Sequence, residues 1–303
     1  KSIEIYKGEL EKINKNDKEL CGYMQNTIGY TYKLLCEENT QQKEIDIQKA
    51  NKWYHKLWKN IVRYCIKGEG TTTTKDTENS IEDWKRQAET YLKKSVENNP
   101  KGRYHQNLGA YYAAIRDYDK ALEQYKLAFN AEKRDDKIYN LIGSVLLYRA
   151  EMKLGISERF QKGIVLSEIT LDKIDEEERL NIQNDIKQAY EWLNLAIKQV
   201  NPIINAYYNY SKACIYDSLF LGGGSQKMSE ADKYLNTVEI IWNMNDSQKP
   251  KGYLYTRRNY WEANKEYDKA LEINQVIMKV DNSGDAKTAE RVYDSKKRNK
   301  NNG

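Results

Sequence analysis

The chain has 303 residues, of which 39% are hydrophobic, with 50 Lys and Arg against 45 Asp and Glu. A mean hydropathy of −0.92, with no apolar run near the roughly 18–20 residues that cross a bilayer, predicts a soluble protein. The low counts of 16 Gly, 3 Pro and 4 Cys exclude collagen, low-complexity linkers and disulfide scaffolds. Most of the positive excess lies in the last 17 residues, so the body is nearly neutral and offers no basic face to nucleic acid.

From the N-terminus, the first predicted helix is the one that contains Ile28 and Gly29, where small and apolar residues recur at helical spacing. The Thr-rich residues 68–79 disfavour a helix and predict a loop. No alternating apolar stretch bounded by turn residues persists anywhere in the chain, which indicates essentially no β-sheet.

Residues 104–132 give the clearest pattern, with apolar and small residues at helical spacing on two segments that Arg116 and Asp117 separate. This pattern predicts a helical hairpin. Gly109 on the first helix and Ala121 on the second permit a close approach of the two helices.

Four further elements are predicted toward the C-terminus. The acidic residues 172–179 predict the start of a long helix that ends before Pro202. Residues 221–226 and 245–252 predict loops, and a terminal helix is expected near residues 285–297.

The hairpin resembles the tetratricopeptide repeat, whose period is about 34 residues. Six positions match that pattern: Leu108, Gly109, Tyr112, Ala121, Tyr125 and Ala128. The terminal Pro of the pattern is absent, since Lys133 stands near that place, and the six residues 118–123 recur letter for letter at residues 267–272.

Small residues of the second helices mark the repeat along the chain, at Ala50, Ala88, Ala121, Gly155, Ala189, Ala231 and Ala270. Several of the intervals fall near the period of about 34 residues, which indicates five to seven units. MKLGISERFQKG, the sequence around Gly155, also fits a helix end with Gly155 as its C-terminal stop.

The resemblance implies an all-α fold, a right-handed superhelical solenoid of tetratricopeptide-like hairpins with capping helices. We expect residues 1–303 to form a single domain, with the array over about 20–280. Residues 281–303 would supply a terminal helix and a basic, partly disordered tail.

Residues that carry catalysis are scarce. His55 and His105 are the only imidazoles, and no arrangement of a catalytic triad surrounds either. No phosphate-binding motif occurs, and the cysteines show neither C-x-x-C spacing nor a His cluster. We therefore expect that the protein is not an enzyme and binds neither a cofactor nor a metal. We also expect it to be cytoplasmic, with its cysteines present as free thiols. The four cysteines are Cys21, Cys36, Cys65 and Cys214.

In the resembled family the first helix of each unit lines a concave groove, which here would be rich in Tyr, Asn, Gln, Lys and Arg and poor in acids. Such a wall suits a peptide or partner segment, because amide side chains bond an extended backbone and Tyr supplies rigid contact area. The groove positions so implied are Tyr23, Asn26, Tyr30, Lys33, Arg103, Gln106, Asn107, Ala110, Lys137, Asn140, Ser144, Tyr148, Asn205, Tyr208, Lys212, Tyr216, Tyr255 and Asn259.

The family's carboxylate clamp is matched only in part, by Arg103, Asn107 and Lys137, and Leu141 stands where a cation is expected. A receptor for chaperone tails is therefore disfavoured.

The sequence leaves several functions open. The protein would be a sensor or scaffold portion of a larger intracellular protein, since no initiator Met opens the chain, or a stand-alone adaptor. Exposed aromatics such as Trp53, Trp58 and Trp84 would serve a homo-oligomer. The alternatives from other classes are an RNA-binding helical repeat and an enzyme built on a helical toroid.

Overall fold

A computed structural model describes residues 7, 25, 26, 29, 30, 33, 77–132, 136–242, 249–281 and 284–301. In these ranges every regular element is helical, with ten α-helices and two short 3-10 helices. The predictions of an all-α protein and of no sheet are confirmed for these residues. The chain divides into two compact units, Lys1–Glu132 and Lys133–Gly303, and each is described by itself.

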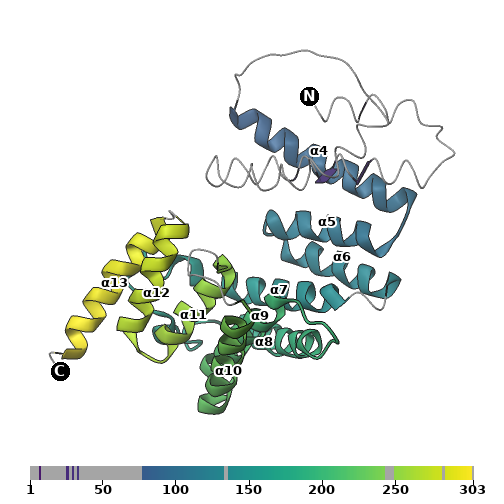
Figure 1. Cartoon of the computed structure of the whole chain (residues 1–303). Helices are drawn as coiled ribbons and strands as arrows, with labels where there is room; N and C mark the ends of the chain where they lie inside the picture. Colours follow the sequence, from purple (N-terminus) through teal and green to yellow (C-terminus); the bar gives the residue numbers. More distant parts are fainter. Residues whose placement is uncertain are drawn as a thin grey trace. The chain divides into compact units, whose positions relative to one another are not determined.

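The first unit contains α4 (Thr77–Asn98), α5 (Gly102–Ala114) and α6 (Tyr118–Ala131), and α5 packs on both α4 and α6 (Figure 1). The turn between α5 and α6 passes through Arg116, whose φ is 63°. Asp117 then caps α6, because its side chain accepts a hydrogen bond from the Lys120 backbone N–H. The hairpin predicted over residues 104–132 is confirmed.

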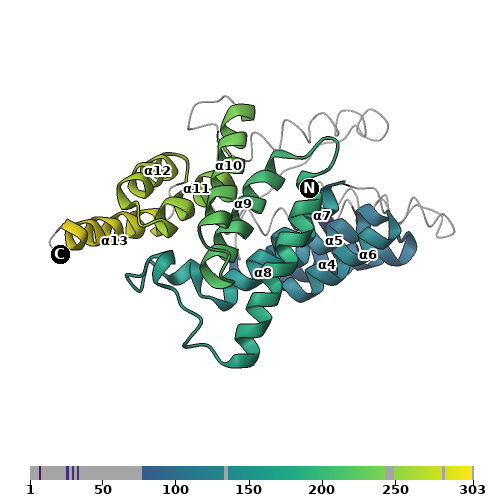
Figure 2. The same ribbon diagram turned by 90° about the horizontal axis from the view of Figure 1, so that it is seen from below.

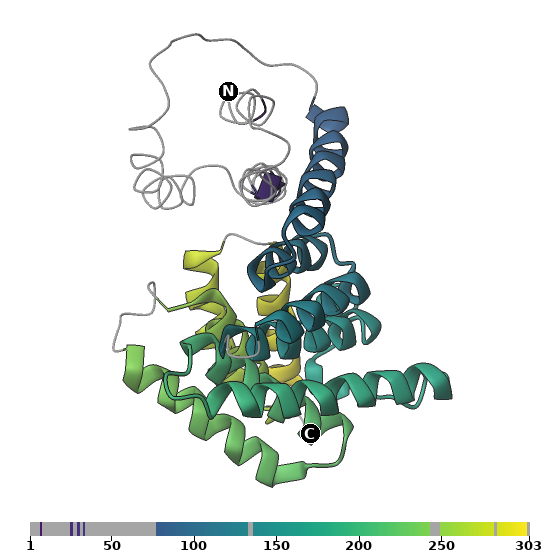
Figure 3. The ribbon, with the colours of Figure 1, turned by 90° about the vertical axis from the view of Figure 1, so that its right-hand side faces the viewer.

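The second unit is a succession of helical hairpins in which α7 packs on α8, α9 on α10, and α11 on α12. Figure 2 shows α12 beside α13, the last helix, and Figure 3 shows the same helices from another side, with α10 in green. The first helices of successive hairpins also touch, α7 with α9 and α9 with α11. The bounds are α7 Asp136–Lys153, α8 Glu176–Ile197, α9 Ile204–Phe220, α10 Gly224–Trp242, α11 Lys251–Ala263, α12 Tyr267–Val280 and α13 Gly284–Asn301.

One helix–helix contact recurs in three hairpins. The second helix carries a fully buried alanine, and the residue four positions after it lies against a glycine of the first helix. If that glycine had a Cβ atom, the atom would lie within 2.7 Å of the facing side chain. The three pairs are Gly29 with Leu92, Gly109 with Tyr125, and Gly143 with Leu193. The marker alanines themselves are 0% exposed: Ala88, Ala121, Ala189, Ala231 and Ala270.

Gly155 marks a helix end, one of the two interpretations that its sequence allows. The helix α7 ends at Lys153, and Gly155 has a φ of 62°, a left-handed conformation that favours glycine. Using Gly155 as a unit marker is therefore wrong, because no second helix passes through it. Ala50, another of the markers, lies outside the described residues.

We call residues 154–175, which join α7 to α8, the connecting segment. It contains the 3-10 helices η1 (Ile156–Glu158) and η2 (Leu166–Glu168) and lies in sequence between the two helices of one hairpin. The nearly regular intervals on both sides of Gly155 are therefore a coincidence of this inserted length with the repeat period.

Helix boundaries agree with the sequence where caps define them. The Asp175 side chain accepts from the Glu178 backbone N–H, and Glu176, Glu177 and Glu178 follow in the first turn of α8, which confirms the acidic helix start. The predicted terminal helix is confirmed as α13.

The predicted loops are wrong at their ends. Residues 77–79 belong to α4, residues 224–226 to α10 and residues 251–252 to α11, while residues 68–76 lie outside the described chain. In α10 the burial of Met228 and Ala231 begins within two turns of Gly224, so tertiary packing outweighs the weak local propensity of the glycines.

The free thiol of Cys214 is buried in α9, and burial raises its pKa. The thiolate is the reactive form, so we expect Cys214 to resist iodoacetamide in the native protein and to react after unfolding in urea. Peptide mass spectrometry at matched pH measures both states. Equal alkylation of Cys214 in the two states would contradict its burial.

Candidate partner-binding surface

Ten of the predicted groove positions lie on α7, α9 and α11, and we call their side of the second unit the α7–α9–α11 face. Residues three to four positions apart share one side of a helix, and these three helices touch in succession. The positions are Lys137, Asn140, Ser144, Tyr148, Asn205, Tyr208, Lys212, Tyr216, Tyr255 and Asn259.

Buried amides link α7 to α9. Asn209 Nδ2 donates to Asn140 Oδ1 at 3.0 Å and to Ser144 Oγ at 2.9 Å, and all three residues are buried. The sequence reasoning selected Asn140 and Ser144 as groove positions but missed Asn209, their shared donor. These polar side chains form the floor of the face, and each of these hydrogen bonds satisfies a polar group that is buried from water.

The same amide pair occurs in the first unit. Asn107 Nδ2 donates to Asn26 Oδ1 at 2.9 Å. Asn107 directly precedes Leu108-Gly109, and Asn209 directly precedes Tyr210-Ser211, which diverges from the motif but stands at the corresponding place of a later hairpin. The signal that could have identified Asn209 is therefore its position relative to the repeat motif.

A half-buried ion pair lies between α7 and α9. Lys212 Nζ is 2.9 Å from Glu151 Oε1, and Tyr216 donates its hydroxyl to the same oxygen at 2.5 Å. Burial acts to lower the pKa of Lys212, but the Glu151 carboxylate outweighs it and the pKa is raised. Lys212 therefore stays charged, and its Nζ lies 5.2 Å from the centroid of the Tyr148 ring.

Two predicted tyrosines are interior groups. Tyr216 is fully buried, and Tyr208 is buried against Gly252 of α11, where a Cβ would meet its ring at 2.8 Å. Burial raises the pKa of both phenols. Both hydroxyls therefore stay protonated, and the rings form the floor of the face.

The connecting segment covers the Asn259 end of the face. Arg159 donates to Asn259 Oδ1 at 2.9 Å and forms an ion pair with Glu262 at 3.1 Å. Glu262 also accepts the Leu166 backbone N–H and, at 3.0 Å, the Tyr293 hydroxyl. The side-chain oxygen of Asn259 therefore already accepts a hydrogen bond from the protein's own Arg159. Nothing in the sequence of the connecting segment indicated this contact.

The accessible part of the face is centred on α7 and the start of α9. Tyr148 is 40% exposed and Met152, one turn further along α7, is 50% exposed. Lys137, at the start of α7, and Asn205, at the start of α9, are also exposed. Tyr255, on α11, is half-buried and donates its hydroxyl to Asp281 Oδ2 at 3.0 Å.

The predicted positions of the first unit are also mostly covered. Asn26 is buried, Gln106 and Asn107 are half-buried, and Tyr23 lies outside the described residues. Tyr30 and Lys33 are half-buried, with Lys33 Nζ 5.2 Å from the Tyr30 ring centroid. Arg103 is exposed, with its guanidinium 5.1 Å from the ring centroid of Tyr104.

Groups suited to metal binding do not gather in the described ranges. There, no three His, Cys, Asp or Glu side chains are placed to hold a metal ion. His105 is buried with Nδ1 2.9 Å from Gln124 Oε1. Among the described helices none is both long and apolar enough to span a bilayer.

Comparisons with known proteins add no family. No protein-family model matches this sequence, and no curated protein gives a significant match to it.

Proposed function

We propose that this protein is a non-enzymatic interaction module that binds a peptide or an extended partner segment on the α7–α9–α11 face. The observation that carries this proposal is the exposed pair Tyr148 and Met152, which accompanies a floor of buried and half-buried polar side chains that bond one another. An exposed aromatic and thioether over a rigid base is typical of a contact site for an apolar anchor side chain.

The rest of the face supports an extended ligand. Lys137 and Asn205 are exposed at the beginnings of α7 and α9 and offer donors to backbone carbonyls or to an acidic side chain of the partner. Because the floor residues already bond one another, binding requires little reordering of the protein, which favours affinity.

We also propose that the hairpins form a right-handed, tetratricopeptide-like solenoid. The recurring contact of a glycine with a second-helix side chain and the repeated Asn–Asn pair support this architecture. Such an array presents its first helices along one wall. A scaffold in the cytoplasm is the role we assign to it, which agrees with the free, buried thiol of Cys214.

A displayed library of random peptides, selected against the full chain, tests the binding proposal. We expect selected peptides to share an apolar anchor and to lose at least about tenfold in affinity for Tyr148→Ala, since a central aromatic contact contributes about 2 kcal/mol. Fluorescence polarisation with labelled peptides measures the change.

Leu195→Ala is the matched control, because Leu195 is also exposed, at 46%, but lies on α8 away from the selected positions. It should leave affinity unchanged. Peptides that bind Tyr148→Ala as tightly as the unaltered protein would refute the site. Selection of no peptide, together with low-salt binding of random single-stranded RNA that Tyr148→Ala abolishes, would favour the RNA-binding alternative.

A further inference from the structure

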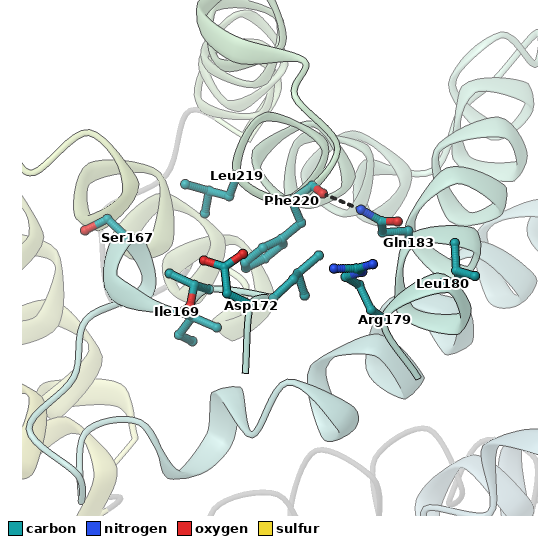
Figure 4. A pocket seen from close by; sticks show the side chains of 10 residues that line it. Ser167, Ile169, Asp172, Arg179, Leu180, Gln183, Leu219 and Phe220 are labelled. Atoms are coloured by element: carbon teal, nitrogen blue, oxygen red, sulfur yellow. Dashed lines mark hydrogen bonds between the residues drawn. The ribbon is translucent and has the colours of Figure 1, made fainter. Parts of the chain in front are cut away.

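A cavity of about 610 Å³ lies between the connecting segment and the facing ends of α8 and α9 (Figure 4). Its volume falls within the range of small-molecule sites, about 300–1,000 Å³. It shares no residue with the α7–α9–α11 face. The side chains that line it are those of Ser167, Ile169, Thr170, Leu171, Asp172, Arg179, Leu180, Gln183, Leu219 and Phe220.

Tertiary contacts fix the walls of this cavity. Gln183 Nε2 donates to the Phe220 carbonyl oxygen at 3.2 Å and so joins α8 to the end of α9 (Figure 4). The connecting segment is fastened on its other side, where Glu168 forms a 2.6 Å ion pair with Lys296 of α13. The cavity is therefore built by elements that other contacts hold in place.

The cavity brings together one cation and one anion that do not pair with each other. Figure 4 shows Arg179 and Asp172 extending toward the middle of the space from opposite walls. Arg179 is 39% exposed, and its ion pair is a long one, 4.0 Å, to the exposed Glu176. Both charged groups are thus accessible to a ligand, and together they offer partners to a molecule that carries both signs of charge.

The remaining lining divides into an apolar and a polar part. Leu219 and Phe220 present apolar surface from the end of α9. At the other end of the cavity, the Oγ atom of Ser167 is buried and has no hydrogen-bond partner among the described residues.

We propose that this cavity binds a short zwitterionic ligand with an apolar side chain, namely a free amino acid or a dipeptide. The carboxylate would bond the Arg179 guanidinium, whose planar fork fits two carboxylate oxygens. The ammonium group would bond Asp172, and the apolar side chain would pack on Leu219 and Phe220. This site is independent of the peptide-binding face.

Isothermal titration of the full chain with leucine and with leucyl-leucine tests this proposal and distinguishes its two sources. We expect leucine or leucyl-leucine to bind. The same ligand with its amino group acetylated, or with its carboxyl group converted to an amide, should bind at least about tenfold more weakly, since each blocked form lacks one charge. Arg179→Gln and Asp172→Asn should each cause a loss of similar size.

Lys173→Gln is the matched control, because it removes an exposed charge of the same segment that does not line the cavity. It should leave binding unchanged. Failure of both zwitterions to bind at millimolar concentration would overturn the proposal. Binding that is indifferent to both Arg179→Gln and Asp172→Asn would overturn it too, and circular dichroism of each variant confirms that the helices are retained.

Discussion

Arg159→Met is expected to lower the free energy of unfolding of the second unit by about 3–5 kcal/mol, the usual cost of removing one partner of a buried ion pair. Arg159 and Glu262 are 5% and 0% exposed. Burial acts to lower the pKa of Arg159, but the Glu262 carboxylate outweighs it and raises the pKa, so Arg159 stays charged. Without Arg159, Glu262 would be a buried carboxylate with no cation.

Urea denaturation followed by circular dichroism measures this loss, and hydrogen exchange localises it to the connecting segment, α11 and α13. In Arg159→Met/Glu262→Gln the unpaired charge is gone, so the double variant should be more stable than Arg159→Met alone. Lys162→Met removes an exposed cation of the same segment and should change stability by less than about 0.5 kcal/mol. A loss for Arg159→Met no larger than for Lys162→Met would contradict the buried network.

Gly143→Leu is expected to destabilise the α7–α8 hairpin by about 3 kcal/mol, because the new side chain would overpack a filled contact. A Cβ at this position would lie 2.5 Å from Leu193 Cγ and 3.2 Å from the carbonyl oxygen of Ala189. The backbones of the two helices would have to separate. The midpoint of urea denaturation measures the change.

Gly284→Leu provides the comparison, since Gly284 opens α13 and a Cβ there would have no atom within 4 Å. Its stability should stay within about 0.5 kcal/mol of the unaltered protein. Equal effects of the two substitutions would show that glycine at position 143 is not required by a close helix approach, and would weaken the repeat interpretation that rests on it.

The local patterns that predicted structure correctly are those whose contacts lie within one helix or one pair of helices. The hairpin of α5 and α6 follows from Gly109, which lies against Tyr125, and from the fully buried Ala121. The acidic start of α8 follows from a cap that involves only Asp175 and the next three residues. Neither depends on distant parts of the chain.

Predictions of the candidate site were less complete, because burial there depends on neighbouring hairpins. Periodicity placed Asn140, Tyr208 and Tyr216 on one side of their helices, but contacts with neighbouring helices bury all three side chains. Only Lys137, Tyr148 and Asn205 are both predicted and well exposed in the second unit. The cavity beside Arg179 was not predicted, since its walls come from three separate elements.

By itself the sequence determined that the described chain is helical, where its best hairpin lies, and which small residues let paired helices approach. These features arise from spacing within one or two helices. Tertiary structure alone decided that the connecting segment lies against α11 and α13, and that Arg159 donates a hydrogen bond to Asn259. It also decided that Arg179 and Asp172 line the same cavity. The physical reason is that such contacts join residues as many as 128 positions apart, whose meeting depends on how the hairpins pack.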